Sequence, residues 1–224
     1  MIECAKPDHP ACPVCQARST TTFAELDGRS YWRCLRCLAT FLDPAHLPGS
    51  VEERAHYLTH ENDPADPRYR AFLARLADPL IAVLPHAMSG LDYGCGPGPA
   101  LARMMREAGH DMAIYDPFFA PDAGVLARTY DFITSTEVAE HFHDPHGEFA
   151  KLDAMLVPGG WLAIMTTFQT GDDRFAGWHY RKDPTHVVFY RRDTMRQIAA
   201  DLGWSCNFPA DNVVIYCKPQ QCAG

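Results

Sequence analysis

The spacing of apolar residues predicts an α/β domain in the larger, C-terminal part of the chain. Apolar residues recur at helical spacing in four segments: "RYRAFLARLADPLIAVL", "PALARMMREAG", "HGEFAKLDAMLVPGG" and "RDTMRQIAADLG". Short apolar runs typical of strands lie between and after them: "SGLDYG", "DMAIYD", "YDFITST", "WLAIMTTF", "WSCNF" and "NVVIYCKP". Strands that alternate with helices predict a mostly parallel sheet with helices on both of its faces.

Residues 1–43 have a different pattern, which is dominated by cysteine. Two CxxC pairs, Cys12 with Cys15 and Cys34 with Cys37, are separated by eighteen residues. The segment between them predicts a hairpin that turns at Asp27-Gly28. Four thiolates at this spacing are typical of a tetrahedral Zn²⁺ site, in which every position is filled by sulfur. We therefore predict a zinc ribbon whose metal is structural.

Composition and charge narrow the function. The 224 residues are 47% hydrophobic and 21% charged, with a formal net charge of −8, which disfavours a nucleic-acid partner. The N-terminus has no apolar signal region, and no run approaches the roughly 20 apolar residues of a membrane span. We expect a cytoplasmic protein with no membrane partner, and in that compartment metal binding explains the nine cysteines better than disulfides do. The oligomeric state is not encoded in these patterns.

A glycine-rich turn follows the expected strand "SGLDYG". In "LDYGCGPG" the glycines let the backbone approach a ligand closely, and the helix that follows aims its amide groups at that ligand. Asp116 ends the next strand, where an acid can accept hydrogen bonds from ribose hydroxyls. The residues after Gly98 do not complete the G-x-G-x-x-G spacing of a dinucleotide site.

These motifs, together with "YDFITSTEVAEHFHDP" and "LVPGGWLAIMT", resemble those of class I S-adenosylmethionine-dependent methyltransferases in order and character. The resemblance covers roughly residues 68–218, and it implies a Rossmann-like sheet in a methyltransferase domain of residues 67–224. It also implies that S-adenosylmethionine lies over the glycine-rich turn, with Asp116 on the ribose. The implied cofactor-binding residues are Asp92, Gly94, Cys95, Gly96, Gly98, Asp116, Thr134 and Glu137.

The chain departs from the family between Asp116 and Tyr130. Only "PFFAPDAGVLART" separates them, which is too short for a full helix and strand. The third strand–helix unit is therefore truncated. No residue in the segment matches the acid that family members often place near the adenine, so the sequence does not identify the residue that recognises this base.

The stretch "EVAEH" carries candidate chemistry. In a helix that opens after Thr136, Glu137, Glu140 and His141 would share one face. Two carboxylates and an imidazole on one face could bind Mg²⁺, Mn²⁺ or Zn²⁺. The stretch resembles the E-x-x-E-H element of the small-RNA 3′-end 2′-O-methyltransferases, which implies that these three residues and His186 hold a metal. Two other interpretations stay open: His141 or His186, beside Glu140, acts as a general base without a metal, or the face is an inert polar surface.

Residues 44–66 form a connector rich in proline, aspartate and histidine, which we expect to fold across the active site. The loop "GWHYRKDPTHVVFY" lies where the family usually builds substrate specificity. From these two segments and the helix start between them, the substrate-contact candidates are Tyr57, His60, Tyr69, Trp178, His179, Tyr180 and Asp183.

The function predicted from these features is O-methylation of a small molecule by an S-adenosylmethionine-dependent methyltransferase. Within the enzyme class the alternative is an RNA methyltransferase that acts on a 2′-oxygen or a base, which the net negative charge disfavours. From another class, the chain could be a non-catalytic adaptor that binds the cofactor and docks through its zinc ribbon.

Overall fold

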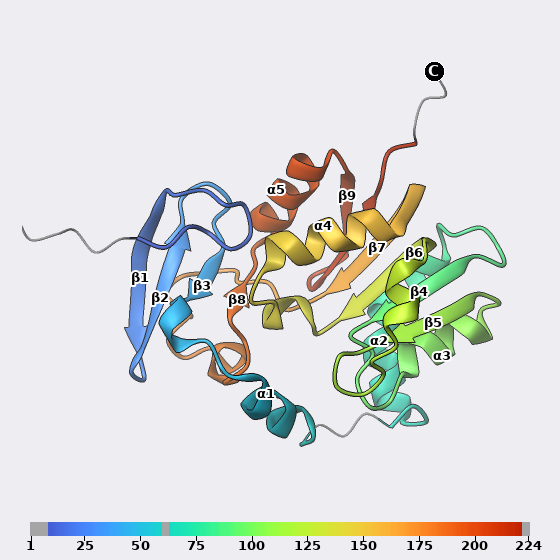
Figure 1. Ribbon diagram of the computed structural model, residues 1–224, viewed down its shortest axis with the longest axis horizontal. Helices are drawn as coiled ribbons and strands as arrows, with labels where there is room; N and C mark the ends of the chain where they lie inside the picture. The colour runs from blue at the N-terminus through green and yellow to red at the C-terminus, as the bar shows by residue number, and fades with distance from the viewer. Residues whose placement is uncertain (1–8, 60–62, 221–224) are drawn as a thin grey trace, which may run out of the picture.

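The computed structural model of the protein describes residues 9–59 and 63–220 (Figure 1). A six-stranded sheet forms the centre of the C-terminal part, in the order β5-β4-β6-β7-β10-β9. Its strands are β4 (Ser89–Tyr93), β5 (Asp111–Tyr115), β6 (Tyr130–Thr136), β7 (Leu156–Met165), β9 (Ser205–Ala210) and β10 (Val213–Cys217). Strands β5, β4, β6 and β7 run parallel, while β10 is antiparallel to both β7 and β9.

Helices cover both faces of this sheet, as predicted. The helices are α2 (Pro67–Ile81), α3 (Ala100–Glu107), α4 (Pro145–Met155) and α5 (Arg192–Leu202). Phe132 packs with α2 and α3 in one hydrophobic cluster, whereas its neighbour Ile133 packs with α4 and α5 in the other. Alternate residues of a strand point to opposite faces, so the two helix pairs lie on opposite sides (Figure 1). Among the described residues, no helix combines the length and the apolar character of a membrane span.

The link between β5 and β6 is short. It holds one 3-10 helix, η2 (Ala123–Ala127), where a full unit would add a helix and a further strand. The truncation predicted from the sequence is therefore present, and it leaves β5 at the edge of the sheet.

A second, antiparallel sheet carries the cysteine pairs. Its strands are β1 (Thr20–Leu26), β2 (Arg29–Cys34), β3 (Thr40–Leu42) and β8 (Val188–Phe189). The predicted hairpin joins β1 to β2, and both turn residues, Asp27 and Gly28, have positive φ, as a tight hairpin turn requires. Strand β8 comes from the far end of the sequence and pairs with β3, with Phe41 opposite Val188. The smaller sheet is therefore completed by the C-terminal part of the chain.

One hydrophobic cluster runs through both sheets. It contains Cys34 and Phe41 from the smaller sheet together with Leu152 and Ile164 from the larger part. The connector between the sheets includes the 3-10 helix η1 (Pro44–His46) and helix α1 (Ser50–Tyr57), which lies below both sheets in Figure 1. The N-terminal segment thus packs as a wall against the larger part.

The expected helix after Thr136 is not formed, which corrects that prediction. Strand β6 ends at Thr136, Glu137 has a φ of 53°, and only a 3-10 turn, η3 (Ala139–His141), follows. Helix α4 begins instead at Pro145, because Asp144 caps it by accepting a hydrogen bond from Gly147 N and proline is favoured at the first helical position.

Candidate active site

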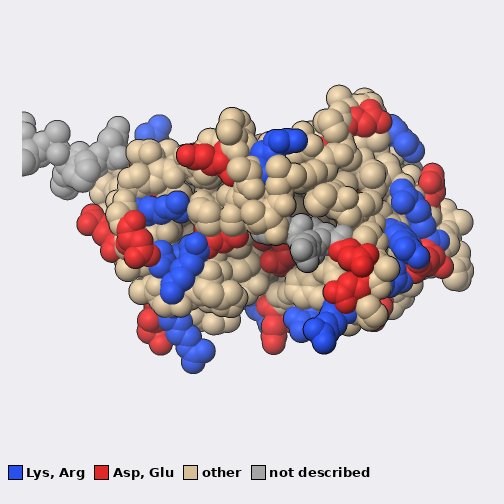
Figure 2. Space-filling view, turned by 90° about the horizontal axis from the view of Figure 1, so that it is seen from below, with Lys and Arg blue, Asp and Glu red and all other residues tan. Residues whose placement is uncertain are grey.

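A cavity of about 790 Å³ opens at the carboxyl ends of β4, β5 and β6. This edge of a parallel sheet is where α/β proteins usually bind ligands. In Figure 2 the molecule is hollowed near the middle of the face that is seen from below, and acidic side chains are visible inside the hollow. The walls come from α1, α2, the turn after β4, the η3 segment and the loop before β8.

The glycine-rich turn forms one wall of the cavity. Gly94 and Gly96 have φ angles of 80° and 63°, a region that side-chain-bearing residues rarely adopt. A Cβ atom added to Gly94 would lie 2.4 Å from a methyl carbon of Val138. The nitrogen atoms of Gly94 and Cys95 donate hydrogen bonds to Tyr115 O, so glycine is required where the turn crosses between β4 and β5.

Asp116 fixes the same turn from the end of β5. Its Oδ2 accepts a hydrogen bond from Gly96 N at 3.0 Å, and its Oδ1 accepts from Phe118 N and Phe119 N. An ionised carboxylate offers about four acceptor positions, so one position remains for a ligand in the cavity that Asp116 lines.

Asp92 and Thr134 occupy different environments. Thr134 is fully buried and does not line the cavity; its hydroxyl donates a hydrogen bond to Asp92 Oδ1 at 3.0 Å. The expectation that Thr134 contacts the cofactor is therefore replaced by a supporting role. Asp92 does line the cavity, and burial raises its pKa to about 6, although the hydrogen bond from Thr134 opposes the shift.

This pKa predicts a pH dependence of stability. The folded protein holds the Asp92 proton more tightly than the unfolded chain, whose aspartates have a pKa near 4. The free energy of unfolding should therefore fall by about 2 kcal/mol between pH 4 and pH 6, and lose little more from this group above pH 7. Urea titrations of the wild type and Asp92→Asn across this range measure the difference. Parallel curves for the two proteins would contradict the prediction.

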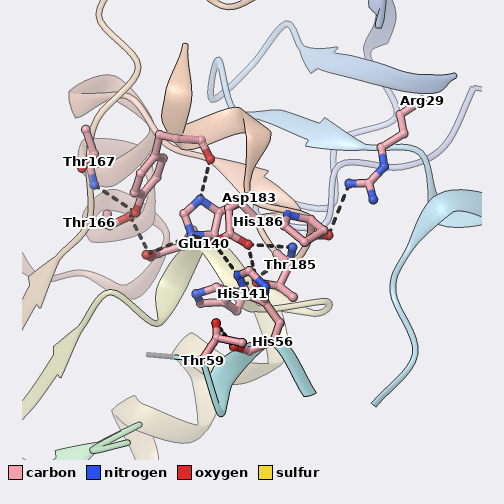
Figure 3. Close-up of polar contacts among 12 residues, drawn as sticks. Arg29, His56, Thr59, Glu140, His141, Thr166, Thr167, Asp183, Thr185 and His186 are labelled. Carbon is pink, nitrogen blue, oxygen red and sulfur yellow. Dashed lines mark hydrogen bonds and ion pairs between the residues drawn. The ribbon is translucent and has the colours of Figure 1, made fainter. Parts of the chain in front are cut away.

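One carboxylate and two imidazoles form a group beside the cavity, and both imidazoles line it. Glu140, His141 and His186 each offer one ligand atom, and these atoms all lie within 4.8 Å of one another. The two imidazole rings have centroids 4.7 Å apart, and His186 Nε2 is 3.9 Å from Glu140 Oε1. Figure 3 shows the three side chains converging from η3 and from the loop before β8. The hydrogen bond from Val187 N to Glu140 O, 2.8 Å long, ties these two segments together.

The remaining ring atoms of this group are fixed by hydrogen bonds. His141 Nδ1 is 3.0 Å from Thr185 O, and His186 Nδ1 is 2.7 Å from Tyr180 O. Because a carbonyl oxygen can only accept, each Nδ1 carries the hydrogen and each Nε2 presents a lone pair when its ring is neutral. Burial also lowers the pKa of His186, which favours the neutral ring.

Glu140 completes the same arrangement. It is fully buried, its Oε2 accepts a hydrogen bond from Thr166 at 2.8 Å, and its Oε1 has no hydrogen-bond partner among the described residues. A buried acceptor without a partner costs about 1–3 kcal/mol, and more when it is charged. The carboxylate oxygen and the two imidazole nitrogens therefore form a set of acceptors in need of a cation or a donor.

Glu137 lines the cavity but does not join that group. Glu137 is not part of a helix; its backbone has a positive φ, and this conformation directs the side chain into the cavity lining. Its Oε1 also has no hydrogen-bond partner within the described part of the chain. Burial and the nearby charge of Glu140 raise the pKa of Glu137 to about 9. The sequence suggested four metal ligands, but the structure brings together only Glu140, His141 and His186, and Glu137 lies outside this group.

The substrate-contact candidates are placed unevenly. Five of them line the cavity: Tyr57, Tyr69, His179, Tyr180 and Asp183. Trp178 does not line it, because its ring packs against Phe175, Tyr180 and Phe189. His60 lies outside the described residues. The expectation of a substrate contact by Trp178 is therefore corrected to a packing role.

Several lining residues were not predicted: Glu53, Tyr93, Tyr115, Phe118, Phe142, His143, Glu148 and Lys151. His143 is exposed, and its Nε2 is 3.0 Å from Glu53 Oε1. Residues of α4 reach the cavity because that helix starts at Pro145. The Asp144-Pro145 pair is a helix-start signal that could have revealed this in the sequence.

The four cysteines of the CxxC pairs form a second, buried group. Cys12 Sγ is 3.6 Å from Cys37 Sγ, Cys15 Sγ is 3.6 Å from Cys34 Sγ, and all four sulfur atoms lie within 4.8 Å of one another. Tetrahedral zinc with bonds of about 2.3 Å holds its sulfurs about 3.8 Å apart. Cys34 Sγ also accepts hydrogen bonds from the backbone nitrogens of Arg36 and Cys37. The donor set and its spacing therefore fit zinc.

Comparison with known proteins identifies the family. The family model described as "Methyltransferase domain" matches residues 60–207. No curated protein matches the chain by sequence.

Among solved structures, the chain is similar to the 1,6-didemethyltoxoflavin-N1-methyltransferase of Burkholderia thailandensis, which was solved with 1,6-didemethyltoxoflavin and S-adenosylhomocysteine. The identity is 16%, the TM-score is 0.55, and the match covers 83% of this chain and 98% of that one. N-methyltransferase NodS of Bradyrhizobium japonicum WM9 has 16% identity and a TM-score of 0.47, and its match covers 75% of this chain and 98% of that one. The match to the family model spans more than half of the chain, which therefore belongs to the methyltransferase domain family and is an S-adenosylmethionine-dependent methyltransferase with a Rossmann-like class I fold.

Proposed function

We propose that the protein transfers the methyl group of S-adenosylmethionine to an oxygen atom of a small molecule. The observation that carries this proposal is that a single cavity joins the glycine-rich turn to His141 and His186, whose ring nitrogens lie close to the buried carboxylate of Glu140. The Burkholderia relative, which was solved with S-adenosylhomocysteine, supports the choice of donor.

The donor would lie across the glycine-rich turn. Asp116 has one acceptor position left for a ribose hydroxyl, and Asp92 would lie near the methionine end. The sulfonium methyl must point at the acceptor for in-line transfer, so it would face His141 and His186 across the cavity. Most of the rate enhancement in such a reaction comes from holding donor and acceptor in this alignment.

The charge of the lining supports a small acceptor without phosphate groups. Seven of the described lining residues are acids: Glu53, Asp92, Asp116, Glu137, Asp144, Glu148 and Asp183. Lys151 is the one lysine or arginine among the described lining residues, and it already donates a hydrogen bond to Tyr93 OH. An RNA backbone would enter this cavity against its charge, so we favour a neutral or cationic molecule over RNA.

Glu140, His141 and His186 would hold a divalent cation. Three protein ligands with one position open to the cavity are the arrangement of catalytic metal sites, and the donation of each Nδ1 to a carbonyl is what metal-bound histidines usually show. The two imidazole ligands suit Zn²⁺ better than Mg²⁺, whereas the carboxylate also suits Mn²⁺. Such a cation lowers the pKa of a bound hydroxyl group, and this chain's contribution is to fix the ligands and to shield them from water.

Metal binding can be tested without knowing the acceptor. Mn²⁺ titrated into the wild type in a calorimeter should bind at one site, beyond any zinc at the cysteines. Glu140→Gln, which keeps the hydrogen bond from Thr166, should weaken that binding at least about 100-fold because a charged ligand is lost. Glu25→Gln on the exposed part of β1 is the control and should bind Mn²⁺ normally. Equal binding by all three proteins, or none by the wild type, favours the metal-free role of His186 as general base.

Residues 9–43 would form a zinc ribbon with a structural role. The closed set of four sulfurs leaves no open position for a reactant. Arg181 in the loop before β8 is buried and donates hydrogen bonds to Asp27 in the β1–β2 turn and to Ala176 O. The ribbon is thus proposed to brace the loop that carries His186.

The methyltransferase activity itself is tested with S-adenosylhomocysteine, which should bind the purified protein with a micromolar dissociation constant by calorimetry. Release of S-adenosylhomocysteine from S-adenosylmethionine in the presence of hydroxylated small molecules then reports turnover. Tight binding without turnover on any acceptor would favour the adaptor. Absence of binding at millimolar ligand would remove the donor from the proposal.

A further inference from the structure

We infer that the purine ring of the donor binds in a subsite formed by Tyr93, Tyr115 and Phe142, where the carboxylate of Glu148 accepts a hydrogen bond from the exocyclic amino group. This inference rests on the proposed function, because it assumes that S-adenosylmethionine occupies the cavity. It assigns the base-recognising residue that the truncated third unit does not provide.

The subsite is a group of three aromatic side chains in the cavity lining, with Lys151 Nζ 5.2 Å from the centroid of the Tyr93 ring. Tyr93 ends β4 and Tyr115 ends β5, and their rings stack with centroids 5.3 Å apart and an angle of 27° between the planes. The Phe142 ring lies 6.4 Å from that of Tyr93, and all three residues line the cavity. Stacking on an aromatic side chain is worth about 1–3 kcal/mol for a nucleic-acid base.

The order of the donor's parts is compatible with a base at these aromatic residues. Asp116, the proposed ribose ligand, directly follows Tyr115 in the sequence and hydrogen bonds to the glycine-rich turn. The sulfonium must face His141, whose ring contacts that of Tyr57 at 5.2 Å. Because ribose separates sulfonium from base, a donor whose ribose binds Asp116 can place its base beside Tyr115, the residue before Asp116.

The truncated third unit adds no full helix or further strand beside β5. Strand β5 is the edge of the sheet, and the link after it contains η2 alone. Helix α4 supplies the lining in place of the missing elements, through Glu148 and Lys151. A base in this position would therefore be read by residues of α4.

Glu148 has the chemistry to recognise an amino group. Its Oε2 accepts a hydrogen bond from Tyr93 OH, while its Oε1 faces Lys151 Nζ at 3.5 Å and retains acceptor capacity. The side chain is 29% exposed, so it reaches the cavity without being desolvated. A carboxylate accepts from the amino group of adenine and repels the carbonyl that replaces this group in hypoxanthine.

The test compares S-adenosylhomocysteine with S-inosylhomocysteine, which carries that carbonyl. The wild type should bind the adenine compound about 10–100-fold more tightly, because the inosine compound leaves a charged acceptor unpaired. Glu148→Gln should bring the two affinities to within about threefold, since a glutamine amide can donate to the carbonyl or accept from the amino group. Glu25→Gln on β1 should keep the wild-type preference.

A second pair of variants tests the aromatic surface. Tyr115→Leu should weaken the binding of both compounds about tenfold or more while the preference between them persists, and Tyr115→Phe should bind as the wild type does. An unchanged preference in Glu148→Gln, or no loss in Tyr115→Leu, overturns the subsite. If the wild type binds neither compound, the proposed function is overturned as well. Failure of the subsite alone can therefore be distinguished from failure of the proposed function.

Discussion

Replacing Cys34 by alanine should abolish stoichiometric zinc in the purified protein and lower its free energy of unfolding by more than about 4 kcal/mol. The reason is that binding of a structural zinc is coupled to folding, so losing a ligand removes folding free energy directly. Cys34 is also fully buried in the hydrophobic cluster that both sheets share. Elemental analysis gives the zinc content, and urea unfolding followed by tryptophan fluorescence gives the stability.

The matched control is Cys206→Ala, which removes a half-buried free thiol from β9. It should keep the zinc and lose no more than about 1 kcal/mol. Zinc loss should also reach the active site, because β8 pairs with β3, which begins just after Cys37. The Mn²⁺ binding expected at His186 should weaken in Cys34→Ala. Full stability without zinc would show that the sulfur cluster is not structural.

Replacing Gly94 by alanine should weaken S-adenosylhomocysteine binding about 100-fold and destabilise the protein by roughly 2–5 kcal/mol. Two causes add: alanine at a φ of 80° is strained by about 1–2 kcal/mol, and the new Cβ would stand 2.4 Å from a Val138 methyl carbon, so the turn must shift. Calorimetry and urea titration measure the two effects.

Gly109→Ala separates strain from steric overlap. Gly109 has a φ of 92°, but a Cβ there would meet no atom within 4 Å. This variant should lose about 1–2 kcal/mol of stability and bind S-adenosylhomocysteine normally. The double variant Gly94→Ala with Val138→Ala should recover part of the lost affinity. If Gly94→Ala binds the ligand as well as Gly109→Ala does, the turn is not part of the donor site.

Local patterns predicted much of the fold, because they depend on neighbouring residues. Alternation of strands and helices predicted the α/β sheet, and the Asp27-Gly28 turn followed from hairpin chemistry. The prediction for the stretch after Thr136 was wrong because it assumed one continuous helix, whereas Glu137 has a left-handed φ that interrupts any helix at this position. A left-handed φ at a glutamate has no sequence signature, since it is imposed by the surrounding packing.

The candidate site was predictable only where it is local. The glycine-rich turn and Asp116 can each be recognised from a short local motif, and in the structure Gly96 N donates a hydrogen bond to Asp116. The approach of His186 to Glu140 depends on a loop forty-six positions away in the sequence. No spacing rule applies over that distance, and the same holds for the pairing of β8 with β3.

That strand pairing bears on how the protein could diversify. The family model begins at residue 60, so the ribbon lies outside the shared ancestry that the model captures, yet it forms a backbone ladder with the loop that carries His186. Substitutions in the ribbon could thus retune which acceptors the cavity admits while every lining side chain stays the same. Conversely, a shortened chain that starts at the family boundary would leave Val188 and Phe189 with an unpaired strand edge, and we expect it to aggregate.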